Sequence, residues 1–339
     1  MIASIMKTLT VGIPVFNEIK YIDATITNIC EISKNVSYQV EILIIDNCSF
    51  DGTRNYLETL RIDLTNVRLK VIYNNKNEGF NYSYDQLVKN ATGSYVWIIG
   101  GQDLIYSQGL KALEELWDFN YDYLICNARI KDERLDKIIN ESLWGSIEEQ
   151  SFSTIENFFK VLGGPCQAVS CNIIKTEFLR PQLSNSIESP LWGYIERLID
   201  ALVYNRNDLR IKFINTALVE MLIEEHGWQS KIQYAKFTPT IEISEVYKKK
   251  FRGQRKILNK AAPFRDVFGI TRTFIEAKVL DQSLSLELFN RLRNIFGHKL
   301  SFWFFALPIL ASPKPVAECL VKTKPLVHIL RRVFKVRSF

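Results

Sequence analysis

The chain has 339 residues, of which 47% are hydrophobic and 12% aromatic, so it can bury a large core and is neither disordered nor fibrous. Its formal net charge is +6, but residues 226–339 carry 22 Lys and Arg against 7 Asp and Glu, whereas residues 1–225 carry 21 against 30. The basic rear part therefore predicts an anionic partner, either nucleic acid or a phospholipid surface.

The six cysteines form no CxxC pair and have no histidines at zinc-ligand spacing, which favours a reducing, cytoplasmic setting. Lys7 interrupts the apolar start of the chain and Pro14 closes it, so we expect a first strand there and no signal peptide. No stretch reaches the roughly 18 to 20 uninterrupted apolar residues that span a bilayer.

The first hundred residues predict four strands that alternate with helices. The strands are expected at Leu9 to Val15, Glu41 to Asp46, Arg68 to Tyr73 and Val96 to Ile99. The helices are expected at Asp23 to Ser33, Arg54 to Leu60 and Tyr82 to Asn90. The first helix follows from isoleucines at helical spacing, and the last strand from its near-continuous apolar run. This alternation predicts a parallel, doubly wound sheet built by right-handed crossovers.

Polar side chains follow three of these four strands. Asp46 ends the second strand, Asn77 and Glu78 follow the third, and Asp103 follows the fourth after Gly-Gly-Gln. The ends of parallel strands meet at one edge, which is where open α/β sheets bind ligands. Asp103 is therefore the first candidate for a functional residue, with a simple turn and helix cap as the alternative. The chain has no GxGxxG and no GxxxxGK[ST], so neither glycine-rich phosphate loop is present.

Four motifs stand at these strand ends: IPVFNE at Ile13 to Glu18, IIDNCSFDGT at Ile44 to Thr53, NNKNEGFN at Asn74 to Asn81, and ATGSYVWIIGGQD at Ala91 to Asp103. In order and spacing they resemble the nucleotide-sugar domain of family 2 glycosyltransferases. The resemblance covers about the first 105 residues well and the chain to about residue 225 more loosely. It implies a GT-A fold, an α/β doubly wound, mostly parallel sheet, in a domain of residues 1–225. A helical, basic region of residues 226–339 would follow.

The resemblance also implies roles for single residues. In this family the turn after the first strand and the carboxylate after the second hold the base and ribose of the donor nucleotide. By resemblance this work belongs to Pro14, Phe16, Glu18 and Asp46, and a third nucleotide-side loop matches at Asn77 and Gly79. Asp51 is expected to cap the turn and helix of the second motif instead.

The fourth motif departs from the family pattern, which usually has two or three acidic residues there. Gln102 occupies the position of the ribose-facing carboxylate, and Asp103 alone remains as a metal ligand. One carboxylate with substrate phosphates and water can hold Mg²⁺ or Mn²⁺. We therefore expect a metal site that is weak until the donor binds, with a metal-independent enzyme as the alternative.

The acceptor side is expected later in the chain. Within Phe158 to Ile174 a turn at Gly163 and Gly164 precedes a strand, and glycines there would let an acceptor sugar approach the backbone. An ordinary turn is the alternative. Trp192 is placed on the acceptor side as well.

An inverting glycosyltransferase needs a general base, usually a carboxylate at the start of a helix. The family has an acidic pair about ninety residues after the metal motif, and Glu196 matches the second member while Ile195 replaces the first. Glu188 is the second candidate, and a surface or ion-paired glutamate is the plain alternative. His226 has no partner at metal or triad spacing and is expected to be structural.

The rear part is expected to be helical and to lie on a membrane. Leu300 to Ala311 is apolar and aromatic, is broken by Pro308, and has Lys and Arg on both sides. Twelve residues cannot span a bilayer, but this pattern suits the interface of an anionic membrane. A helix buried against the catalytic domain is the alternative. No nucleic-acid-binding motif accompanies the charge, so we expect no nucleic-acid partner.

Together these features predict a peripheral enzyme on the cytoplasmic face of the plasma membrane. It would move a sugar, with inversion, from a nucleotide-diphosphate sugar to a hydroxyl of a lipid-linked oligosaccharide. Within the family the closer likeness is to bacterial O-antigen and lipopolysaccharide transferases of the abequosyltransferase or rhamnosyltransferase kind. A non-catalytic GT-A-like binding subunit and a nucleotidyltransferase remain as alternatives.

Overall fold

The structure is a computed structural model, which describes residues 7–133, 136–223, 237–261, 286–297, 302–313 and 315–316. The chain forms two compact units. The first contains Met1–Ile155 and Pro165–Ile223, and the second contains Glu156–Gly164 and Glu224–Phe339. His226 lies outside the described residues.

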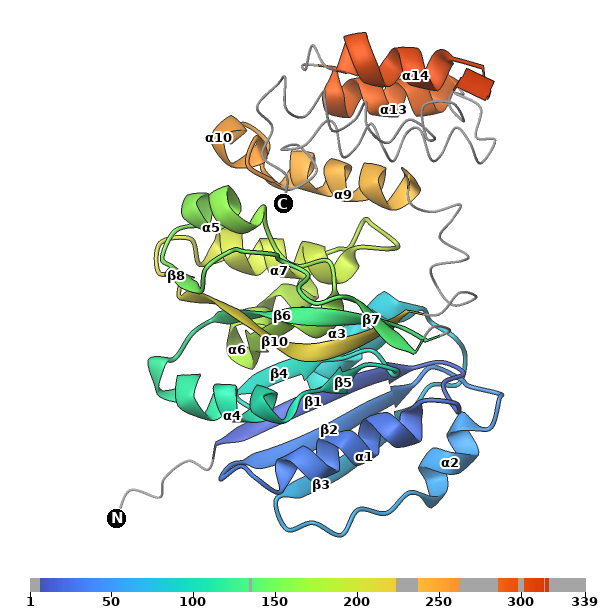
Figure 1. The fold of residues 1–339 in the computed structure, drawn as a ribbon, viewed down its shortest axis with the longest axis vertical. Helices are drawn as coiled ribbons and strands as arrows, with labels where there is room; N and C mark the ends of the chain where they lie inside the picture. Colours follow the sequence, from blue (N-terminus) through green and yellow to red (C-terminus); the bar gives the residue numbers. More distant parts are fainter. Residues whose placement is uncertain are drawn as a thin grey trace. The chain divides into compact units, whose positions relative to one another are not determined.

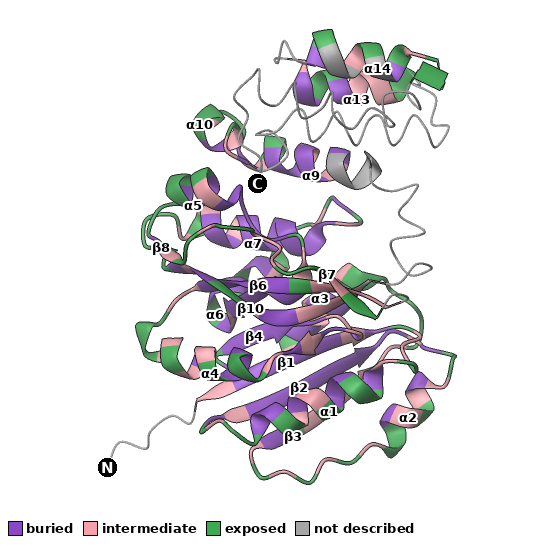
Figure 2. Ribbon diagram, viewed as in Figure 1, coloured by how far each residue is buried: buried purple, intermediate pink, exposed green. Residues whose placement is uncertain are grey.

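The front of the first unit is a parallel sheet. Its strands β1 to β4 are Thr8–Val15, Gln39–Asp46, Val67–Tyr73 and Tyr95–Ile98, in the spatial order β3-β2-β1-β4. The helices between them are α1 Ile22–Ser33, α2 Thr53–Thr59 and α3 Phe80–Asn90. All four predicted strands and three predicted helices are confirmed to within two residues at each end. Strands β1, β2 and β4 are buried along nearly their whole length (Figure 2).

The sheet continues beyond β4 as a mixed sheet. Its further strands are β9 Asn172–Lys175, β6 Tyr123–Asp132, β10 Ile211–Ile223 and β5 Leu104–Ile105, with β7 Lys137–Asn140 beside β6 and β8 Gln150–Phe152 beside β10. Strand β9 pairs antiparallel with both β4 and β6, whereas β6 and β10 are parallel. The prediction of a mostly parallel sheet therefore holds for the first four strands and for the pair β6 and β10, whereas β5, β7, β8 and β9 pair antiparallel and make the sheet mixed. Strand direction depends on tertiary pairing, which the local apolar pattern does not specify.

Helices cover both faces of this sheet. Figure 1 shows α1 and α4 (Ser107–Leu116) in front of the strands and α3 behind them, and α7 (Gly193–Tyr204) contacts α3. The isoleucine stripe of α1 is buried, as its helical spacing predicts. Two short helical segments, α6 Thr176–Leu179 and the 3₁₀ turn η3 Arg180–Ser184, connect β9 to the segment before α7.

The second unit is helical where it is described. Its elements are α5 Ile155–Leu162, apart from its first residue, and α9 Phe237–Lys250, α10 Arg255–Leu258, α13 Leu286–Phe296, a π-helical turn Phe302–Ala306 and α14 Leu307–Ala311. Phe159 of α5 packs edge to face against Tyr247 and Phe251 from α9 and the turn after it. No helix in the described parts of the chain is both long enough and apolar enough to cross a membrane.

A buried carboxylate ties the amino edge of the parallel strands together. Glu41 accepts hydrogen bonds from the hydroxyl of Thr10, at 2.6 Å, and from the backbone N–H of Thr92, at 2.8 Å. Gly93 donates its N–H to the same Thr10 hydroxyl, and a Cβ there would lie 2.5 Å from the backbone nitrogen of Thr10. The turn into β4 therefore requires glycine for a close approach of two backbones.

We predict that Gly93→Ala lowers the free energy of unfolding by about 2 to 3 kcal/mol, because backbone atoms have to move to admit the new methyl group. Urea unfolding measures the change. Gly145→Ala is the control: Gly145 has φ +59° but open space around it, so the cost is limited to about 1 kcal/mol of left-handed strain. Equal stability of Gly93→Ala and wild type would contradict the close approach.

Candidate functional site at the carboxyl edge of the sheet

The ends of β1 to β4 bring the predicted nucleotide-side residues to one edge. The strands are parallel and in register, with Val15 beside Asp46 and Asp46 beside Tyr73. The loops that follow them are cross-linked by side-chain hydrogen bonds. They therefore form one fixed polar surface and do not project independently.

Asn47 is the centre of this cross-linking. Its side-chain oxygen accepts hydrogen bonds from the Asn74 amide, at 2.9 Å, and from the Glu78 backbone, at 3.0 Å. Its own amide donates to the Asn77 side-chain oxygen at 2.8 Å, and that oxygen also accepts from the backbone of Gly79. Gly79 has a φ of +83°, which favours glycine. Asn77 and Gly79 thus lie at the predicted edge, held by a residue that sequence analysis missed.

Asp46 is buried, and its carboxylate binds the chain itself. One oxygen accepts from the backbone of Ser49 at 3.1 Å, and the other accepts from Nε of Arg54 at 2.9 Å. Arg54 also donates to the carbonyl of Asn74 and lies over the ring of Tyr73. The predicted contact of Asp46 with the donor base or ribose stays a prediction, and what the geometry shows is a residue that fixes the loop around it.

The loop after β1 is held by the loop after β2. The backbone of Asn17 donates to the hydroxyl of Ser49 at 2.9 Å, and the side-chain oxygen of Asn17 accepts from the backbone of Phe50 at 3.0 Å. The backbone of Glu18 donates to Thr53. Phe16 is 39% exposed at this edge, while Pro14 is half-buried at the end of β1.

Asp51 makes the contacts predicted for a structural cap. It accepts from both the backbone and the hydroxyl of Thr53 and from the backbone of Ile19. Partial burial opposes ionisation, but these hydrogen bonds outweigh it and lower the pKa of Asp51.

The fourth motif closes the edge beside Glu18. A Cβ placed on Gly101 would lie 3.1 Å from Cγ of Glu18, so the glutamate side chain covers this turn. Gln102 donates its side-chain amide to the carbonyl of Leu222 at 2.9 Å. The fourth motif is therefore joined to β10 as well as to the nucleotide-side loops.

Asp103 is buried and fully engaged. Its Oδ2 accepts from the hydroxyl of Ser170 at 2.5 Å, and its Oδ1 accepts from the backbone of Leu222 at 3.3 Å. The Ser170 hydroxyl in turn accepts from the backbone of Gly100. Burial raises the pKa of Asp103, while the hydrogen bonds from Ser170 and Leu222 work in the opposite direction.

These residues do not fit a preformed cation site. A Mg²⁺ or Mn²⁺ ion needs oxygen ligands aimed at one point. Both oxygens of Asp103 face donors of the chain itself, and the described residues contain no group of three or more His, Cys, Asp or Glu side chains that could hold a metal ion.

The loop before α7 adjoins the nucleotide-side loops. Asn81, in the first turn of α3, donates to the carbonyls of Ser189, at 3.1 Å, and Pro190, at 2.8 Å. Glu196 in α7 is only 2% exposed and accepts from the backbone of Ser189, at 2.6 Å, and of Glu188, at 3.1 Å. Glu196 thus shapes the loop that carries Glu188, which is itself exposed. Trp192 is buried at the end of this loop.

Gly163 and Gly164 belong to the second unit, whereas the carboxyl edge of β1 to β4 belongs to the first. Both have positive φ values, and a Cβ on Gly164 would lie 2.5 Å from the hydroxyl of Tyr247. Close packing against α9 therefore accounts for glycine at Gly164, and the predicted acceptor role stays a prediction.

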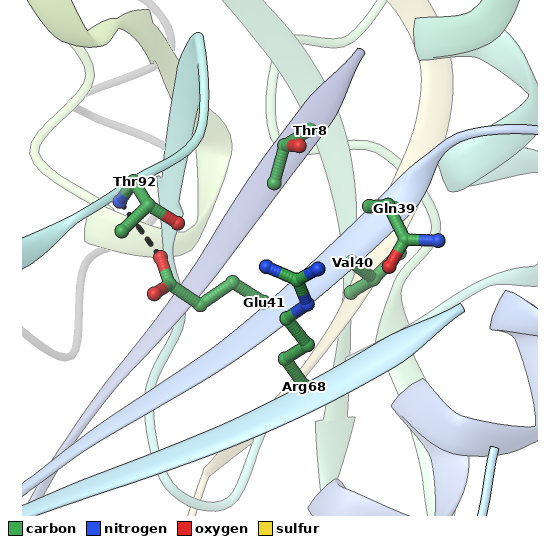
Figure 3. A pocket seen from close by; sticks show the side chains of 6 residues that line it. All are labelled: Thr8, Gln39, Val40, Glu41, Arg68 and Thr92. Atoms are coloured by element: carbon green, nitrogen blue, oxygen red, sulfur yellow. Dashed lines mark hydrogen bonds between the residues drawn. The ribbon is translucent and has the colours of Figure 1, made fainter. Parts of the chain in front are cut away.

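A cavity of about 260 Å³ lies at the opposite, amino edge of the sheet (Figure 3). It is lined by Thr8, Gln39, Val40, Glu41, Arg68 and Thr92. The Glu41 carboxylate within it would repel phosphate, and its hydrogen bonds have the structural role described above. The cavity is therefore not our candidate for the donor site.

An α/β sheet whose parallel strands end in cross-linked polar loops, continued by antiparallel strands, has the architecture of a GT-A glycosyltransferase. The chain belongs to glycosyl transferase family 2, whose family model matches residues 10–181, about half of the chain. That match contains all four strand-end loops.

Two curated relatives match part of the chain. The abequosyltransferase RfbV of Salmonella typhimurium is 29% identical over 119 residues, which are 34% of this chain and 34% of that protein. The uncharacterized glycosyltransferase MG060 of Mycoplasma genitalium is 27% identical over 108 residues, which are 32% of this chain and 36% of that protein. The chain thus matches about a third of the length of each.

Among solved structures, S. aureus TarS 1-349 has a TM-score of 0.53 and 19% identity, with 96% of this chain and 87% of that chain covered. The same protein in complex with UDP-GlcNAc also has a TM-score of 0.53, with 88% of that chain covered. At this identity the likeness shows the shared fold.

The burial of Asp103 predicts how stability depends on pH. Because folding raises its pKa, the folded chain holds this proton more tightly than the unfolded chain, and the contribution of Asp103 to the free energy of unfolding is lost as pH rises through the raised pKa. Asp103→Asn cannot ionise. The free energy of unfolding of the wild type minus that of Asp103→Asn, both measured by urea unfolding, is therefore expected to fall as pH rises from 4 to 7.5.

Asp51→Asn is the control with the opposite sign. Because folding lowers the pKa of Asp51, the stabilisation by this carboxylate is present above its unfolded pKa and lost in acid. The free energy of unfolding of the wild type minus that of Asp51→Asn should therefore grow over the same pH range. If the difference for Asp103→Asn also grew, the carboxylate would be stabilised in its charged form and the burial account would be wrong.

Proposed function

We propose that this chain transfers a sugar from a nucleotide-diphosphate sugar to a hydroxyl of an acceptor saccharide. The observation that supports this most is that the family 2 match, residues 10–181, spans the four strand-end loops at one edge of the sheet, three of which are cross-linked by hydrogen bonds. A donor bound there would meet backbone and amide groups held by Asn47, Asn17 and Asp46. The non-catalytic subunit remains the second candidate, because the fourth motif lacks the usual acidic pattern.

The acceptor that we favour is a lipid-linked oligosaccharide of a cell-surface polysaccharide, as in O-antigen synthesis. One support is the partial match to a protein named abequosyltransferase. The other is the basic, aromatic rear part of the chain. A peripheral position on the cytoplasmic face of the membrane belongs to the same proposal.

The proposed reaction is a single displacement with inversion. The acceptor oxygen attacks the anomeric carbon and loses its proton to a carboxylate, while the bond between that carbon and the diphosphate oxygen breaks and its electron pair leaves with the nucleoside diphosphate. Of the two predicted bases, Glu188 fits the proton transfer better, because the Glu196 carboxylate is buried and already accepts hydrogen bonds from the backbone of Glu188 and Ser189. We therefore assign Glu196 to positioning the loop.

No step of this mechanism runs through a metal ion, since the residues present do not form a cation site. Mg²⁺ or Mn²⁺ supplied with the donor stays a prediction of the family resemblance. Comparing donor turnover with Mn²⁺ and with a chelator tests it.

The test of the function is release of nucleoside diphosphate from UDP-, GDP-, CDP- and dTDP-linked sugars, with and without acceptor. We expect turnover of donors of one nucleotide and slow hydrolysis of the same donor without acceptor. A folded protein that releases no nucleoside diphosphate from any donor would favour the non-catalytic subunit.

For the two glutamates we predict different losses. Glu188→Gln should lower kcat by about 10² or more, the range for loss of a general base, and leave the transition temperature unchanged. Glu196→Gln should lower the transition temperature modestly and leave a larger share of kcat. The amide oxygen can still accept from the backbone N–H groups of Glu188 and Ser189, which both donate to Oε1, but it lacks the negative charge that strengthens these bonds. Kinetics and thermal unfolding of both variants separate these roles.

Glu177→Gln is the matched control, since Glu177 is an exposed carboxylate paired with Lys175. It should keep wild-type kcat. The contrary result would be a kcat close to wild type in Glu188→Gln together with a large loss of kcat, but not of stability, in Glu196→Gln. That result would make Glu196 the general base.

The described part of the second unit exposes apolar side chains near basic ones. Leu286 and Phe304 are 76% and 71% exposed, and Trp303 is 40% exposed. Arg293 lies over the ring of Phe289, which contacts Trp303. Aromatic rings beside cations suit the headgroup region of an anionic bilayer, which supports the proposed membrane association.

We predict that the double variant Trp303→Ser, Phe304→Ser weakens binding to vesicles containing phosphatidylglycerol by about tenfold or more, on the scale of removing two partly inserted rings. Vesicle sedimentation measures this. Tyr204→Ser, which changes a ring of the first unit that is 78% exposed, should bind as wild type does. Unchanged binding of the double variant would exclude these rings as the membrane contact.

A further inference from the structure

Phe50 is the most exposed large hydrophobic side chain among the described residues, with 82% of its surface accessible. It lies in the loop between β2 and α2, at the same edge as the other nucleotide-side loops. Phe50 is not among the site residues that the sequence predicts. An aromatic ring left in water at a candidate binding edge forgoes the gain from burial, which is about 2 kcal/mol for such a side chain.

The backbone that carries Phe50 is fixed. Its N–H donates to the side-chain oxygen of Asn17 at 3.0 Å, and the preceding Ser49 accepts from the backbone of Asn17 at 2.9 Å. On the other side, Asp51 accepts from the backbone of Ile19 at 3.1 Å. The exposure of Phe50 is therefore not that of a loose loop tip.

Two residues next to this contact have left-handed backbone conformations without being glycine. Asn17 has a φ of +60° and Cys48 a φ of +67°. Such conformations cost free energy and concentrate at functional sites. The reciprocal hydrogen bonds between Asn17 and the loop of Ser49 and Phe50 hold the ends of β1 and β2 in one arrangement despite this strain, and Phe50 is exposed in that arrangement.

Phe50 stands beside Phe16, which the family resemblance places at the donor base. Their ring centroids are 5.9 Å apart and the ring planes cross at 76°, an edge-to-face contact. This single ring contact leaves most of the Phe50 surface open, and Phe16 is itself 39% exposed. The two rings thus form a rigid aromatic corner, which we define as Phe16 and Phe50.

We propose that Phe50 is a donor-binding residue, whose ring packs against the base of the nucleoside diphosphate in the aromatic corner. This inference rests on the proposed function. Contact between a base and an aromatic ring tolerates any base, because every base has a π face. Phe50 would therefore add affinity without selecting the nucleotide, and the edges of the base would be read by polar groups of the neighbouring loops.

The experiment is calorimetric titration of wild type, Phe50→Ala, Phe50→Leu and Phe50→Tyr with UDP, GDP, CDP and dTDP. For the nucleotide that wild type binds best, we expect Phe50→Ala to weaken binding by about tenfold or more, in the range for loss of one base-stacking ring. Phe50→Leu should weaken binding nearly as much, because it keeps apolar bulk but has no ring. Phe50→Tyr should bind within a few-fold of wild type.

Phe119→Ala is the matched control. Phe119 is also an exposed phenylalanine, 62% accessible, and contacts only the ring of Tyr121 among the ring pairs described. It lies next to Asp118, which pairs with Lys7 before the start of β1, and so belongs to the other edge of the sheet. Its removal should leave nucleotide binding unchanged, and thermal unfolding checks that every variant is folded.

The outcomes separate this inference from the function on which it rests. If wild type binds a nucleotide and Phe50→Ala or Phe50→Leu binds it equally well, ring contact at Phe50 is wrong while the proposed function stands. If folded wild type binds none of the four nucleotides, the proposed function fails and the inference fails with it. An equal loss in Phe119→Ala would show a general effect of removing surface rings and would also overturn the assignment.

Discussion

A buried carboxylate has to be hydrogen-bonded, and this constraint governs the architecture of the candidate site. Asp46 accepts from Ser49 and Arg54, Asp103 accepts from Ser170 and Leu222, and Glu196 accepts from Ser189 and Glu188. In each case an acidic side chain to which sequence analysis assigns ligand binding or catalysis holds a loop in place. The loops, and the backbone and amide groups that they present, are then fixed before any ligand binds, which reduces the ordering cost of binding.

Much of the fold could be predicted from local patterns. The isoleucine stripe of α1 and the apolar runs of β1 to β4 report burial directly, because the period of the pattern is that of the element. The polar strand ends were also expected to meet at one edge, and they do, since parallel strands place their carboxyl ends together. A strand after Gly163 and Gly164 was expected, but the antiparallel direction of β9 and the presence of β5 could not be predicted, because strands of two to four residues have no periodicity to detect.

The roles of single side chains were harder to predict, for a physical reason. The partners of Asp103 lie 67 and 119 residues further along the chain, so nothing near the Gly-Gly-Gln-Asp sequence shows that its carboxylate is buried and engaged. Asn47 was missed because an asparagine after a strand is indistinguishable from an ordinary turn residue. Phe50 was missed because a single apolar residue in a loop of capping residues has no periodic pattern. Only the exposure of its side chain in the structure distinguishes it from a core residue.

The central claim is that the carboxyl edge of β1 to β4, held by internal hydrogen bonds, binds the nucleotide donor. Amide hydrogen exchange of the whole protein, with and without a saturating nucleoside diphosphate, tests it most directly. The account predicts that protection increases in residues 16–19, 47–53, 74–81 and 99–103. Protection centred instead on the amino edge, around Gln39, Glu41 and Thr92 (Figure 3), would contradict it.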